Sequence, residues 1–533
     1  MVNAVAIDQI GVRQKPIVRR KKFVVHWWMF VAAAVMLTIA VTFGYDLYFG
    51  RLGIIYPQPV IEERGAIRII KVPPGGHVQA AIELALSGDI VELQAGAVYS
   101  GEVKLPNKPL TDFVTIQSSA IADLPPDKRV RPAQRSSMPT LTSGMLGKPA
   151  VSAANGAHHY RFVGIEFTPR SSGYNYALVQ FGNGESPDNL PHDLEIDRSY
   201  LHPLKTGTVR RAIALNSATT TIKNSYIEGI GFPGEETQGI CGWTGTRNAL
   251  ILNNYIEGGA ENIMFGGADP SSPLLTPTDI EIRGNHLNKP AAWQKNVTVK
   301  TLFELKNAKR VQLIGNLLTN NWGGSAFRIT VRNQDNGAPF STIEDVIIKE
   351  NVVDGSGDGI NILGRDDTHP SQTLMRLTIE NNLFLNISGE KEFGGSGYFI
   401  MISDGEGVTI ANNTIFNSGN ITTFYGTMPR DFIFRNNIVG HGDYGIHGLF
   451  DKNWAVGQRF FQNNLIMNLN RIPESDYSFP PGNTFVTSAS DVGFMDASAR
   501  DYRLSPSSKF KGKGREGRDI GANLSPSMMG LGK

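Results

Sequence analysis

The stretch of sequence that decides the fold is TLFELKNAKRVQLIGNLLTNNW, residues 301–322. Apolar and polar residues alternate over residues 303–306 and again over residues 311–314, with a polar interruption between the two runs. A period of two with one apolar face is typical of β-strands, because a helix needs apolar residues three and four positions apart. Gly315 and Asn316 then turn the chain before another apolar pair. The stretch therefore predicts short strands joined by tight corners, as in one turn of a coil.

An asparagine followed by two mostly apolar residues recurs along the chain and marks one corner of each predicted turn. Successive copies stand 24 to 35 residues apart, at Asn224, Asn254, Asn285, Asn316, Asn351, Asn382, Asn413, Asn437 and Asn464. Asparagine suits such a corner because its short side chain tolerates the left-handed backbone conformation. Stacked copies can also hydrogen-bond to one another through their amides. One turn cannot bury its own apolar face, so the repetition predicts an all-β solenoid.

The repeated strands and corners between residues 67 and 524 resemble those of right-handed parallel β-helix proteins, the pectate-lyase-like superfold. More narrowly, residues 75–101, 298–311 and 359–367 are similar to a bacterial subfamily of β-helix proteins of unassigned function. The resemblance implies a right-handed parallel β-helix. It does not imply a particular reaction, because one fold carries many functions.

The first 66 residues carry a predicted membrane anchor. Residues 1–22 are polar and basic, and residues 23–44 form a predominantly apolar run long enough to span a bilayer as a helix. The basic residues should stay in the cytoplasm, which leaves the C-terminal domain of a single-pass membrane protein periplasmic or extracellular. A cleaved signal peptide is the alternative, although such peptides have a shorter apolar region and a small-residue cleavage site. Residues 45–66 are the predicted linker.

The remaining chain divides into a predicted β-helix domain, residues 67–470, and a C-terminal closing segment, residues 471–533. Residues 77–86 have helical apolar spacing and should form a helix that caps the open N-terminal end of the coil, where unpaired strand edges need a cover. The formal net charge of +2 gives no nucleic-acid footprint. The single cysteine, Cys241, excludes an intrachain disulfide.

Three neighbouring turns should project a compact charged row from one sheet, because side chains alternate between the two faces of a strand. The predicted inward residues are Phe303, Leu305, Phe327, Ile329, Val331, Ile360 and Ile362. The predicted outward row is Glu304, Lys306, Arg328, Arg332, Asn361 and Arg365. With Trp293 and Trp322 nearby, this row predicts a site for an acidic polysaccharide, because arginine binds carboxylates and tryptophan can stack on sugar rings.

The chemistry that this row suits is that of a uronate polysaccharide lyase. Such a lyase needs a base beside the substrate carboxylate and a cation that stabilises the resulting negative charge. Lys306 is the predicted base, Arg328 is the predicted stabilising cation because it stays protonated, and Glu304 is a further catalytic candidate. The predicted substrate-binding residues are Arg332, Asn361, Arg365, Trp293 and Trp322. Asp366 and Asp367 could hold Ca²⁺, which prefers oxygen ligands.

A second candidate site combines residues 234–243 with Glu257, Glu261, Asn262 and Asp269, where paired carboxylates would suit glycoside hydrolysis. Residues 302–304 also resemble a fragment of the alginate and chondroitin lyases, whose Arg-His-Gly element this sequence lacks. Two alternatives to an enzyme stay open. One is a surface module that binds glycans or a partner protein, and the other is a purely structural envelope protein. The expected partners are thus an acidic polysaccharide and, through the N-terminal helix, a membrane.

Overall fold

The computed structural model describes residues 56–65, 67–389, 392–448, 460–467, 479–480, 482–525 and 527. Residues Pro57–Lys533 form one compact unit, separate from Met1–Tyr56. The predicted basic tail, the predicted membrane anchor and part of the predicted linker therefore lie outside the described residues. Within the described part of the chain, no helix has both the length and the apolar character that crossing a membrane requires.

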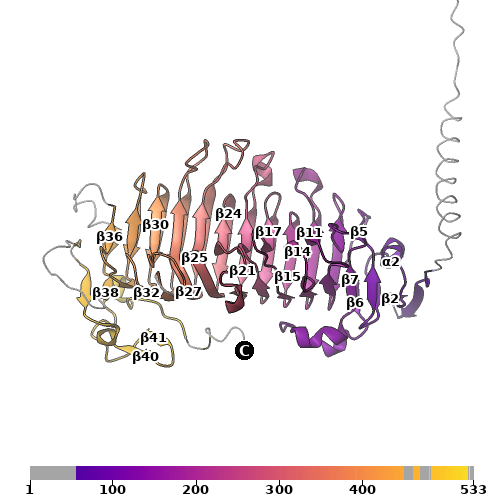
Figure 1. Ribbon diagram of the computed structural model, residues 1–533, viewed down its shortest axis with the longest axis horizontal. Helices are drawn as coiled ribbons and strands as arrows, with labels where there is room; N and C mark the ends of the chain where they lie inside the picture. Colours follow the sequence, from indigo (N-terminus) through magenta and orange to yellow (C-terminus); the bar gives the residue numbers. More distant parts are fainter. Residues whose placement is uncertain are drawn as a thin grey trace, which may run out of the picture. The chain divides into compact units, whose positions relative to one another are not determined.

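The compact unit is a coil of parallel strands arranged as three faces, which stack along the long axis in Figure 1. In a typical turn, β21 (Thr278–Arg283), β22 (His286–Asn288) and β23 (Thr301–Leu305) follow one another, and β24 (Ala308–Ile314) then returns beside β21 in parallel register. Each strand thus pairs with the strand one turn away. This arrangement confirms the predicted parallel β-helix.

Face one is a 15-stranded sheet that is parallel except at β1. Its strands are β1 (Val60–Arg64), β2 (Ile67–Val72), β3 (Ile90–Leu93), β6 (Val114–Ser118), β9 (His158–Val163), β12 (His192–Asp197), β15 (Ala218–Lys223), β18 (Arg247–Leu252), β21, β24, β26 (Ile343–Lys349), β28 (Met375–Glu380), β31 (Glu406–Ala411), β34 (Ile433–Arg435) and β37 (Phe461–Gln462).

Faces two and three are joined into one sheet because two long strands, β25 and β27, run through both of them. The strands of face two are β4 (Val98–Ser100), β7 (Thr140–Thr142), β10 (Glu166–Thr168), β13 (Tyr200–Leu201), β16 (Tyr226–Ile227), β19 (Tyr255–Glu257), β22, the start of β25 (Leu317–Thr330), the start of β27 (Val352–Leu363), β29 (Leu383–Ile387), β32 (Thr414–Asn417), β35 (Ile438–Gly440), β38 (Leu465–Met467) and β39 (Thr484–Val486). The strands of face three are β5 (Val103–Leu105), β8 (Val151–Ala153), β11 (Tyr174–Phe181), β14 (Thr208–Leu215), β17 (Gln238–Gly242), β20 (Glu261–Phe265), β23, the ends of β25 and β27, β30 (Ile400–Ser403), β33 (Thr422–Phe424) and β36 (Ile446–His447).

The interior of the coil is filled by the apolar residues that the alternation predicts. All of the predicted inward residues of the charged-row strands are buried: Phe303, Leu305, Phe327, Ile329, Val331, Ile360 and Ile362. Phenylalanine rings of nearby turns contact one another, with 6.4 Å between the ring centroids of Phe303 and Phe327. Because side chains alternate across a strand, this core leaves the intervening residues on the outside of the sheet.

A ladder of asparagine side chains, buried at all but its last position, runs through the corner between faces one and two. The backbone N–H and the side-chain Nδ2 of Asn285 both donate to Oδ1 of Asn316, at 2.9 and 3.0 Å. Equivalent contacts link each ladder residue to the next, through Asn254, Asn285, Asn316, Asn351, Asn382, Asn413, Asn437, Asn464 and Asn483. The predicted amide ladder is therefore confirmed. It satisfies polar groups that the corner buries.

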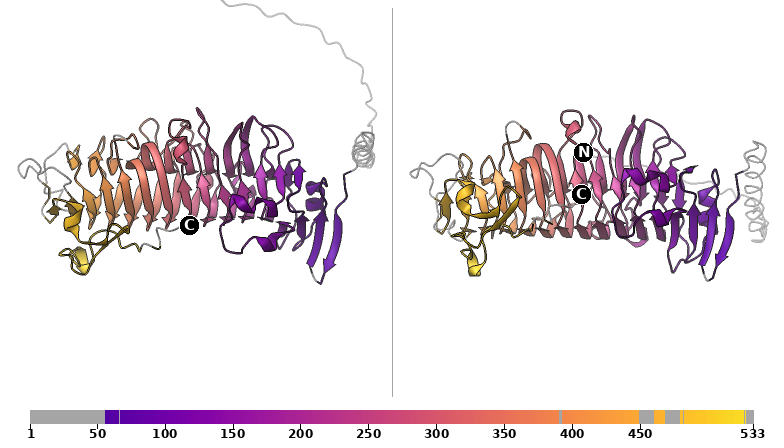
Figure 2. Two further views of the ribbon diagram at one scale, coloured as in Figure 1. Left: turned by 60° about the horizontal axis from the view of Figure 1, so that its bottom comes forward. Right: turned by 90° about the horizontal axis from the view of Figure 1, so that it is seen from below.

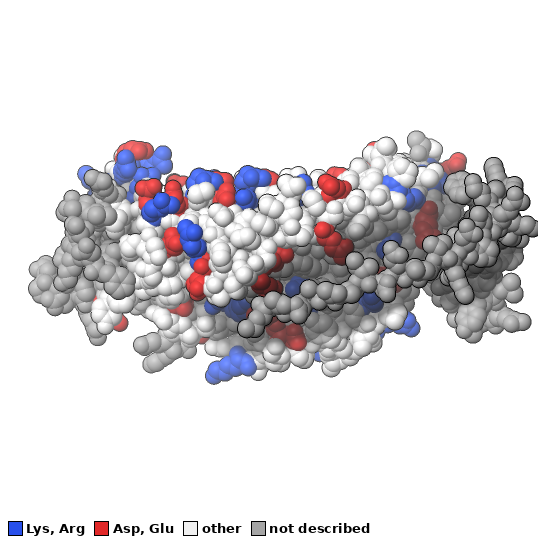
Figure 3. Space-filling model, turned by 90° about the horizontal axis from the view of Figure 1, so that it is seen from above, with Lys and Arg blue, Asp and Glu red and all other residues white. Residues whose placement is uncertain are grey.

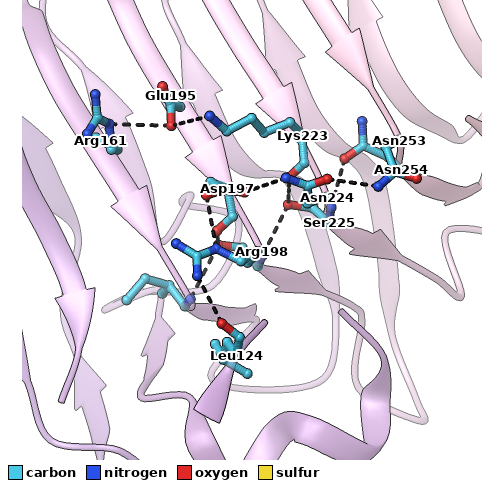
Figure 4. Close-up of polar contacts among 12 residues, drawn as sticks. Leu124, Arg161, Glu195, Asp197, Arg198, Lys223, Asn224, Ser225, Asn253 and Asn254 are labelled. Carbon is cyan, nitrogen blue, oxygen red and sulfur yellow. Dashed lines mark hydrogen bonds and ion pairs between the residues drawn. The ribbon is translucent and has the colours of Figure 1, made fainter. Parts of the chain in front are cut away.

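The predicted asparagines from Asn254 to Asn464 form the ladder, but the left-handed conformation lies one residue earlier than predicted. The left-handed conformation belongs to the residue before each ladder position, with φ of +52° at Asn224 and +63° at Gly315. Asn224 is therefore outside the ladder, and Ser225 stands in its place, donating its backbone N–H to Oδ1 of Asn254 at 2.9 Å. Figure 4 shows the amide of Asn224 bonded to Asp197 instead. The corner therefore needs two adjacent residues with different properties. The first residue adopts the left-handed backbone conformation, and the second supplies the amide of the ladder.

Both ends of the coil carry additional elements. At the N-terminal end, α2 (Val78–Leu84) lies where the capping helix is predicted and buries Val78, Ala81 and Ile82. At the C-terminal end, β40 (Phe494–Asp496) and β41 (Asp501–Leu504) form an antiparallel pair. Leu524 then packs against apolar side chains on the outside of face two, among them Val352 and Leu383.

Candidate functional site

The predicted charged row lies on the outside of face three, where β23 pairs with the end of β25 and β25 pairs with the end of β27. The register sets Glu304 beside Arg328 and Arg328 beside Asn361 on successive turns. Lys306 directly follows β23, and its carbonyl accepts the backbone N–H of Arg332 at 2.9 Å. Neighbouring strands lie about 5 Å apart. Five of the six predicted row residues are therefore close together.

A cavity of about 320 Å³ opens on this face. It is lined by Lys300, Glu304, Lys306, Arg328, Thr330, Arg332, Asn361, Leu363, Asp367 and Tyr425. We call it the face-three cavity. Figure 3 shows acidic and basic side chains next to one another in a hollow along the middle of the β-helix, viewed from above. The charged lining of the face-three cavity suits a polar, ionised ligand.

Two carboxyl groups are buried together beside this cavity. Glu261 of β20 is 0% exposed and Glu304 of β23 is 2% exposed. The Nζ atom of Lys300 lies 2.8 Å from Oε1 of Glu261 and 3.7 Å from Oε2 of Glu304. Gln238 donates a further hydrogen bond to Glu261 at 2.9 Å. One ammonium group thus faces two carboxyl groups and does not neutralise both of them.

The two carboxyl groups titrate differently because their surroundings differ. Burial and the charge of Glu261 raise the pKa of Glu304 to about 7. Burial also acts to raise the pKa of Glu261, but the ammonium of Lys300 outweighs it and holds that pKa below its usual value. Below pH 7, Glu261 is therefore the ionised member of the pair and Glu304 the protonated one. A carboxyl group that keeps its proton near neutrality can act as a general acid.

Lys306 and Arg328 form no ion pair in the described part of the chain, although their charges act on Glu304 and Asp358. Among the described residues, neither side chain has an acidic oxygen within 4.0 Å. The Nε atom of Arg328 and the Oδ1 atom of Asn361 are buried and have no hydrogen-bond partner in the described part of the chain. Leaving a buried polar group unpaired costs about 1–3 kcal/mol, so such atoms mark places where water or a ligand completes the hydrogen bonding.

Arg332, by contrast, is already paired. Its guanidinium contacts Asp367 and lies 3.6 Å from Oδ1 of Asp366. The carboxylate of Asp366 accepts the backbone N–H groups of Asn333 and Thr368, each at 2.7 Å. Burial opposes ionisation there, but these backbone donors lower the pKa of Asp366. Both predicted calcium ligands therefore have protein partners that hold the loop.

A metal site is not evident from the arrangement of possible ligands. Within the described ranges, no group of three or more His, Cys, Asp and Glu side chains is placed to hold a metal ion. Calcium binding at Asp366 and Asp367 stays a prediction.

Three of the predicted substrate-binding residues do not line the face-three cavity. Arg365 donates from Nε to Oδ2 of Asp404 at 3.2 Å. The Trp322 ring stacks on Phe393, with 6.3 Å between the centroids. Trp293 ends the short helix η5 (Ala291–Trp293) in the loop before β23. A contact between these residues and a ligand stays a prediction.

The second predicted site is divided among several places in the structure. Glu261 belongs to the buried pair, and Glu236 reaches the same Lys300 ammonium at 3.2 Å. Glu257 lies on face two, where it accepts the Tyr255 hydroxyl at 2.7 Å. Asp269 accepts three backbone N–H groups from the loop of residues 334–337. Asn262 uses its amide to bond the carbonyls of Ile256 and Asn288. The structure therefore brings Glu236 and Glu261 to one ammonium group, whereas Glu257 and Asp269 have partners elsewhere, and a hydrolytic role for the pair stays a prediction.

Lys300 and Tyr425 line the face-three cavity but were not among the predicted residues. Lys300 lies in the loop before β23, where no strand alternation shows which way a side chain points. Tyr425 directly follows β33, and the alternation of buried Thr422 and Phe424 with partly exposed Thr423 and Tyr425 would have placed it outside the coil.

The three stacked faces and the parallel register define this chain as a right-handed parallel β-helix protein. The family model described as "Periplasmic copper-binding protein (NosD)" matches residues 285–492. No curated protein matches the sequence.

Among solved structures, the chain is similar to the PL6 family alginate lyase AlyGC and to an arginine-to-alanine mutant of it. The mutant is 15% identical, with a TM-score of 0.51, over 87% of this chain and 58% of that chain. The unmutated enzyme is also 15% identical, with a TM-score of 0.50, over 85% of this chain and 57% of that chain. An alginate lyase from Paenibacillus sp. str. FPU-7 is 12% identical, with a TM-score of 0.37, over 72% of this chain and 100% of that chain. The chain thus spans less than two thirds of AlyGC. At this identity the likeness shows the fold alone.

Proposed function

We propose that this protein cleaves an acidic polysaccharide by β-elimination at the face-three cavity. The observation that carries the proposal is that one cavity holds two basic side chains, Lys306 and Arg328, that form no ion pair among the described residues, beside a carboxyl group that keeps its proton near neutral pH. Elimination beside a uronate carboxylate needs these three elements: a base, a cation for the carboxylate and a proton for the leaving group. The alginate-lyase titles of the structural neighbours agree with this reaction class.

Arg328, Lys306, Glu304 and Asn361 each have a separate role in the proposed reaction. Arg328 holds the uronate carboxylate through its guanidinium and stabilises the negative charge that develops when the adjacent carbon loses its proton. Lys306 is the base that takes that proton, so the carbon–hydrogen bond breaks and its electrons form the new carbon–carbon double bond. The bond to the leaving sugar oxygen breaks at the same time, and Glu304 supplies the proton which that oxygen needs. Asn361, with its unpaired Oδ1, is placed to accept a sugar hydroxyl.

We also propose that the β-helix acts outside the cytoplasm, held by a single N-terminal membrane helix. The basic and apolar pattern of residues 1–44 supports this location. The word "periplasmic" in the description of the NosD family model agrees with it.

The test is a screen of the purified full chain against uronic-acid polymers, with a neutral glucan as control. Elimination is followed by the ultraviolet absorbance of the unsaturated product. Lys306→Ala and Lys306→Arg should abolish turnover but leave much of the binding intact, because Arg328 still holds the carboxylate. Lys309→Ala is the matched control, since Lys309 lies three residues away on face one and pairs with Glu344 at 3.4 Å.

The outcomes separate the proposal from its alternatives. Turnover that depends on Lys306 and not on Lys309 supports the lyase. Binding of a uronate polymer without any product identifies a glycan-binding module. If the wild type neither binds nor cleaves any uronate polymer, the proposal is wrong.

A further inference from the structure

A second cavity lies on the outside of face two, beside the ladder corner. It is covered by residues 121–137, which we call the strap. The strap leaves face one after β6 and contains two short helices, η1 (Ile121–Asp123) and η2 (Pro132–Ser137). It crosses the corner between faces one and two. Its course can be followed below the strands in Figure 1 and in the right-hand view of Figure 2.

The strap is held by the row of left-handed corner residues on four successive turns. Arg198 donates from Nη1 to the carbonyl of Leu124 in the strap at 3.0 Å, as Figure 4 shows. The backbone N–H of Val130 donates to the carbonyl of Asn224 at 3.0 Å. Arg129 donates to the carbonyls of Asn253 and Gly284, at 3.1 and 3.2 Å. Arg198, Asn224, Asn253 and Gly284 all have positive φ. Bonds to four turns fix the strap in place.

Between the strap and face two is a cavity of about 610 Å³, which we call the strap groove. Its lining residues are Pro125, Asp127, Lys128, Arg129, Arg131, Pro132, Gln134, Tyr226, Asn253, Tyr255 and His286. This volume falls within the range of about 300–1,000 Å³ that is usual for ligand sites. Its floor is a row of rings on successive turns, with 4.3 Å between the centroids of Tyr226 and Tyr255 and 5.1 Å between those of Tyr255 and His286.

The charge around the strap groove is positive and not compensated. Arg129 bonds only carbonyl oxygens, and no ion pair of Lys128, Arg129 or Arg131 is present among the described residues. Burial lowers the pKa of Arg129 to about 10, so it stays charged at neutral pH. Burial and the neighbouring Arg129 lower the pKa of His286 to about 4, so His286 is neutral there. Asp127 is the single carboxylate of the lining.

The carboxylates behind the ring row are occupied by other donors. Glu228 accepts the hydroxyl of Tyr200, and Glu257 accepts both the hydroxyl of Tyr255 and the backbone N–H of Gly229, at 2.7 Å each. Three cations therefore face the groove with one lining carboxylate to balance them. An anionic ligand would supply the missing charge, and the amides of Gln134 and Asn253 offer hydrogen bonds to hydroxyl groups.

From this geometry we propose that the strap groove is a second, non-catalytic binding site for an anionic oligosaccharide. Lys128, Arg129 and Arg131 bind its carboxylates, and Gln134, Asn253 and the tyrosine edges bind its hydroxyl groups. The site lies on a different face of the β-helix from Lys306 and Arg328, so it does not depend on the lyase reaction. A long acidic polymer bound there is held at a high local concentration near the face-three cavity.

The experiment measures binding of a uronate hexasaccharide by calorimetry to the full chain that carries Lys306→Ala and Arg328→Ala. In that background the face-three cavity is disabled, so any remaining binding reports another site. Adding Lys128→Gln and Arg131→Gln should weaken this binding about tenfold or more, and added salt should weaken it as well. Both residues are exposed, so these changes leave the fold intact. The matched control adds Lys104→Gln and Lys148→Gln, two exposed lysines that line neither cavity.

Retained binding that the strap substitutions weaken and the control substitutions do not would support the site. Three results would overturn it: no binding of the hexasaccharide in the background variant, the same affinity with and without Lys128 and Arg131, or equal binding of a neutral hexasaccharide. Loss of turnover at the face-three cavity leaves this conclusion unaffected, so failure of the two proposals can be told apart.

Discussion

Replacing Asn316 by alanine should destabilise the β-helix by about 3–5 kcal/mol. The Asn316 side chain takes part in four hydrogen bonds: Nδ2 donates to the Ile282 carbonyl at 2.9 Å and to Oδ1 of Asn351 at 3.0 Å, while Oδ1 accepts both the N–H and Nδ2 of Asn285. Each neutral hydrogen bond contributes about 1 kcal/mol net, and the groups left behind are buried with no access to water. Alanine cannot replace any of these contacts.

The assay is urea unfolding of the full chain, followed by circular dichroism. Unfolding midpoints are compared because repeat proteins need not unfold in one step. Asn296→Ala is the matched control, since the Asn296 side chain is exposed and donates one hydrogen bond, to the Ala292 carbonyl. Gly315→Asn tests the register: Gly315 has φ of +63° with open space around it, and other turns hold asparagine there, so this change should be nearly neutral. If Asn316→Ala and Asn296→Ala shift the midpoint equally, the ladder does not stabilise the fold as argued.

Three further predictions concern the titration of the site, a buried cation and the location of the chain. The unfolding free energy should fall as pH rises from about 4.5 to about 7, because the native state binds the Glu304 proton more tightly than the unfolded state does. Glu304→Gln should flatten this slope in urea titrations at several pH values, and an unchanged slope would contradict the raised pKa. Lys289→Met should lower the unfolding midpoint by the equivalent of about 2–4 kcal/mol. The buried Lys289 amine donates to the carbonyls of Gly258 and Gly259 at 2.6 Å, and methionine leaves both carbonyls unpaired. A midpoint equal to that of the wild type would show that these two hydrogen bonds do not stabilise the fold. A reporter enzyme fused after Lys533 should be active only outside the cytoplasm, and cytoplasmic activity would reject the predicted orientation of residues 23–44.

The sequence could predict the β-helix because its two signals, alternation and corner asparagines, act over short stretches. It could not show which of two adjacent corner residues enters the ladder. Asparagine fits both positions, and at several corners it occupies both, as at Asn253-Asn254 and Asn381-Asn382. At Asn224-Ser225 the asparagine occupies the left-handed position and a serine follows it, and there the spacing pattern led to the wrong residue.

The charged row could be predicted for the same reason, since burial of Phe303 and Ile329 leaves Glu304 and Arg328 outside. The contact between Glu261 and Glu304 could not be predicted. It arises because β23 pairs with β20 after an excursion of 35 residues, and the sequence alone does not show that pairing. Residues in loops were the least predictable. Lys300 lines the face-three cavity, whereas Trp293 and Trp322 lie away from it, and neither outcome follows from a period of two.

The central claim is that Lys306 and Arg328 bind and cleave a uronate chain in the face-three cavity. Its most direct test is a crystal structure of the Lys306→Ala chain, soaked with a uronate oligosaccharide that the variant can hold but not cleave. The account predicts a sugar carboxylate within hydrogen-bonding distance of the Arg328 guanidinium, with the space left by the Lys306 side chain facing the carbon beside that carboxylate. An oligosaccharide bound only in the strap groove, or bound in the face-three cavity with its carboxylates turned away from Arg328, would contradict it.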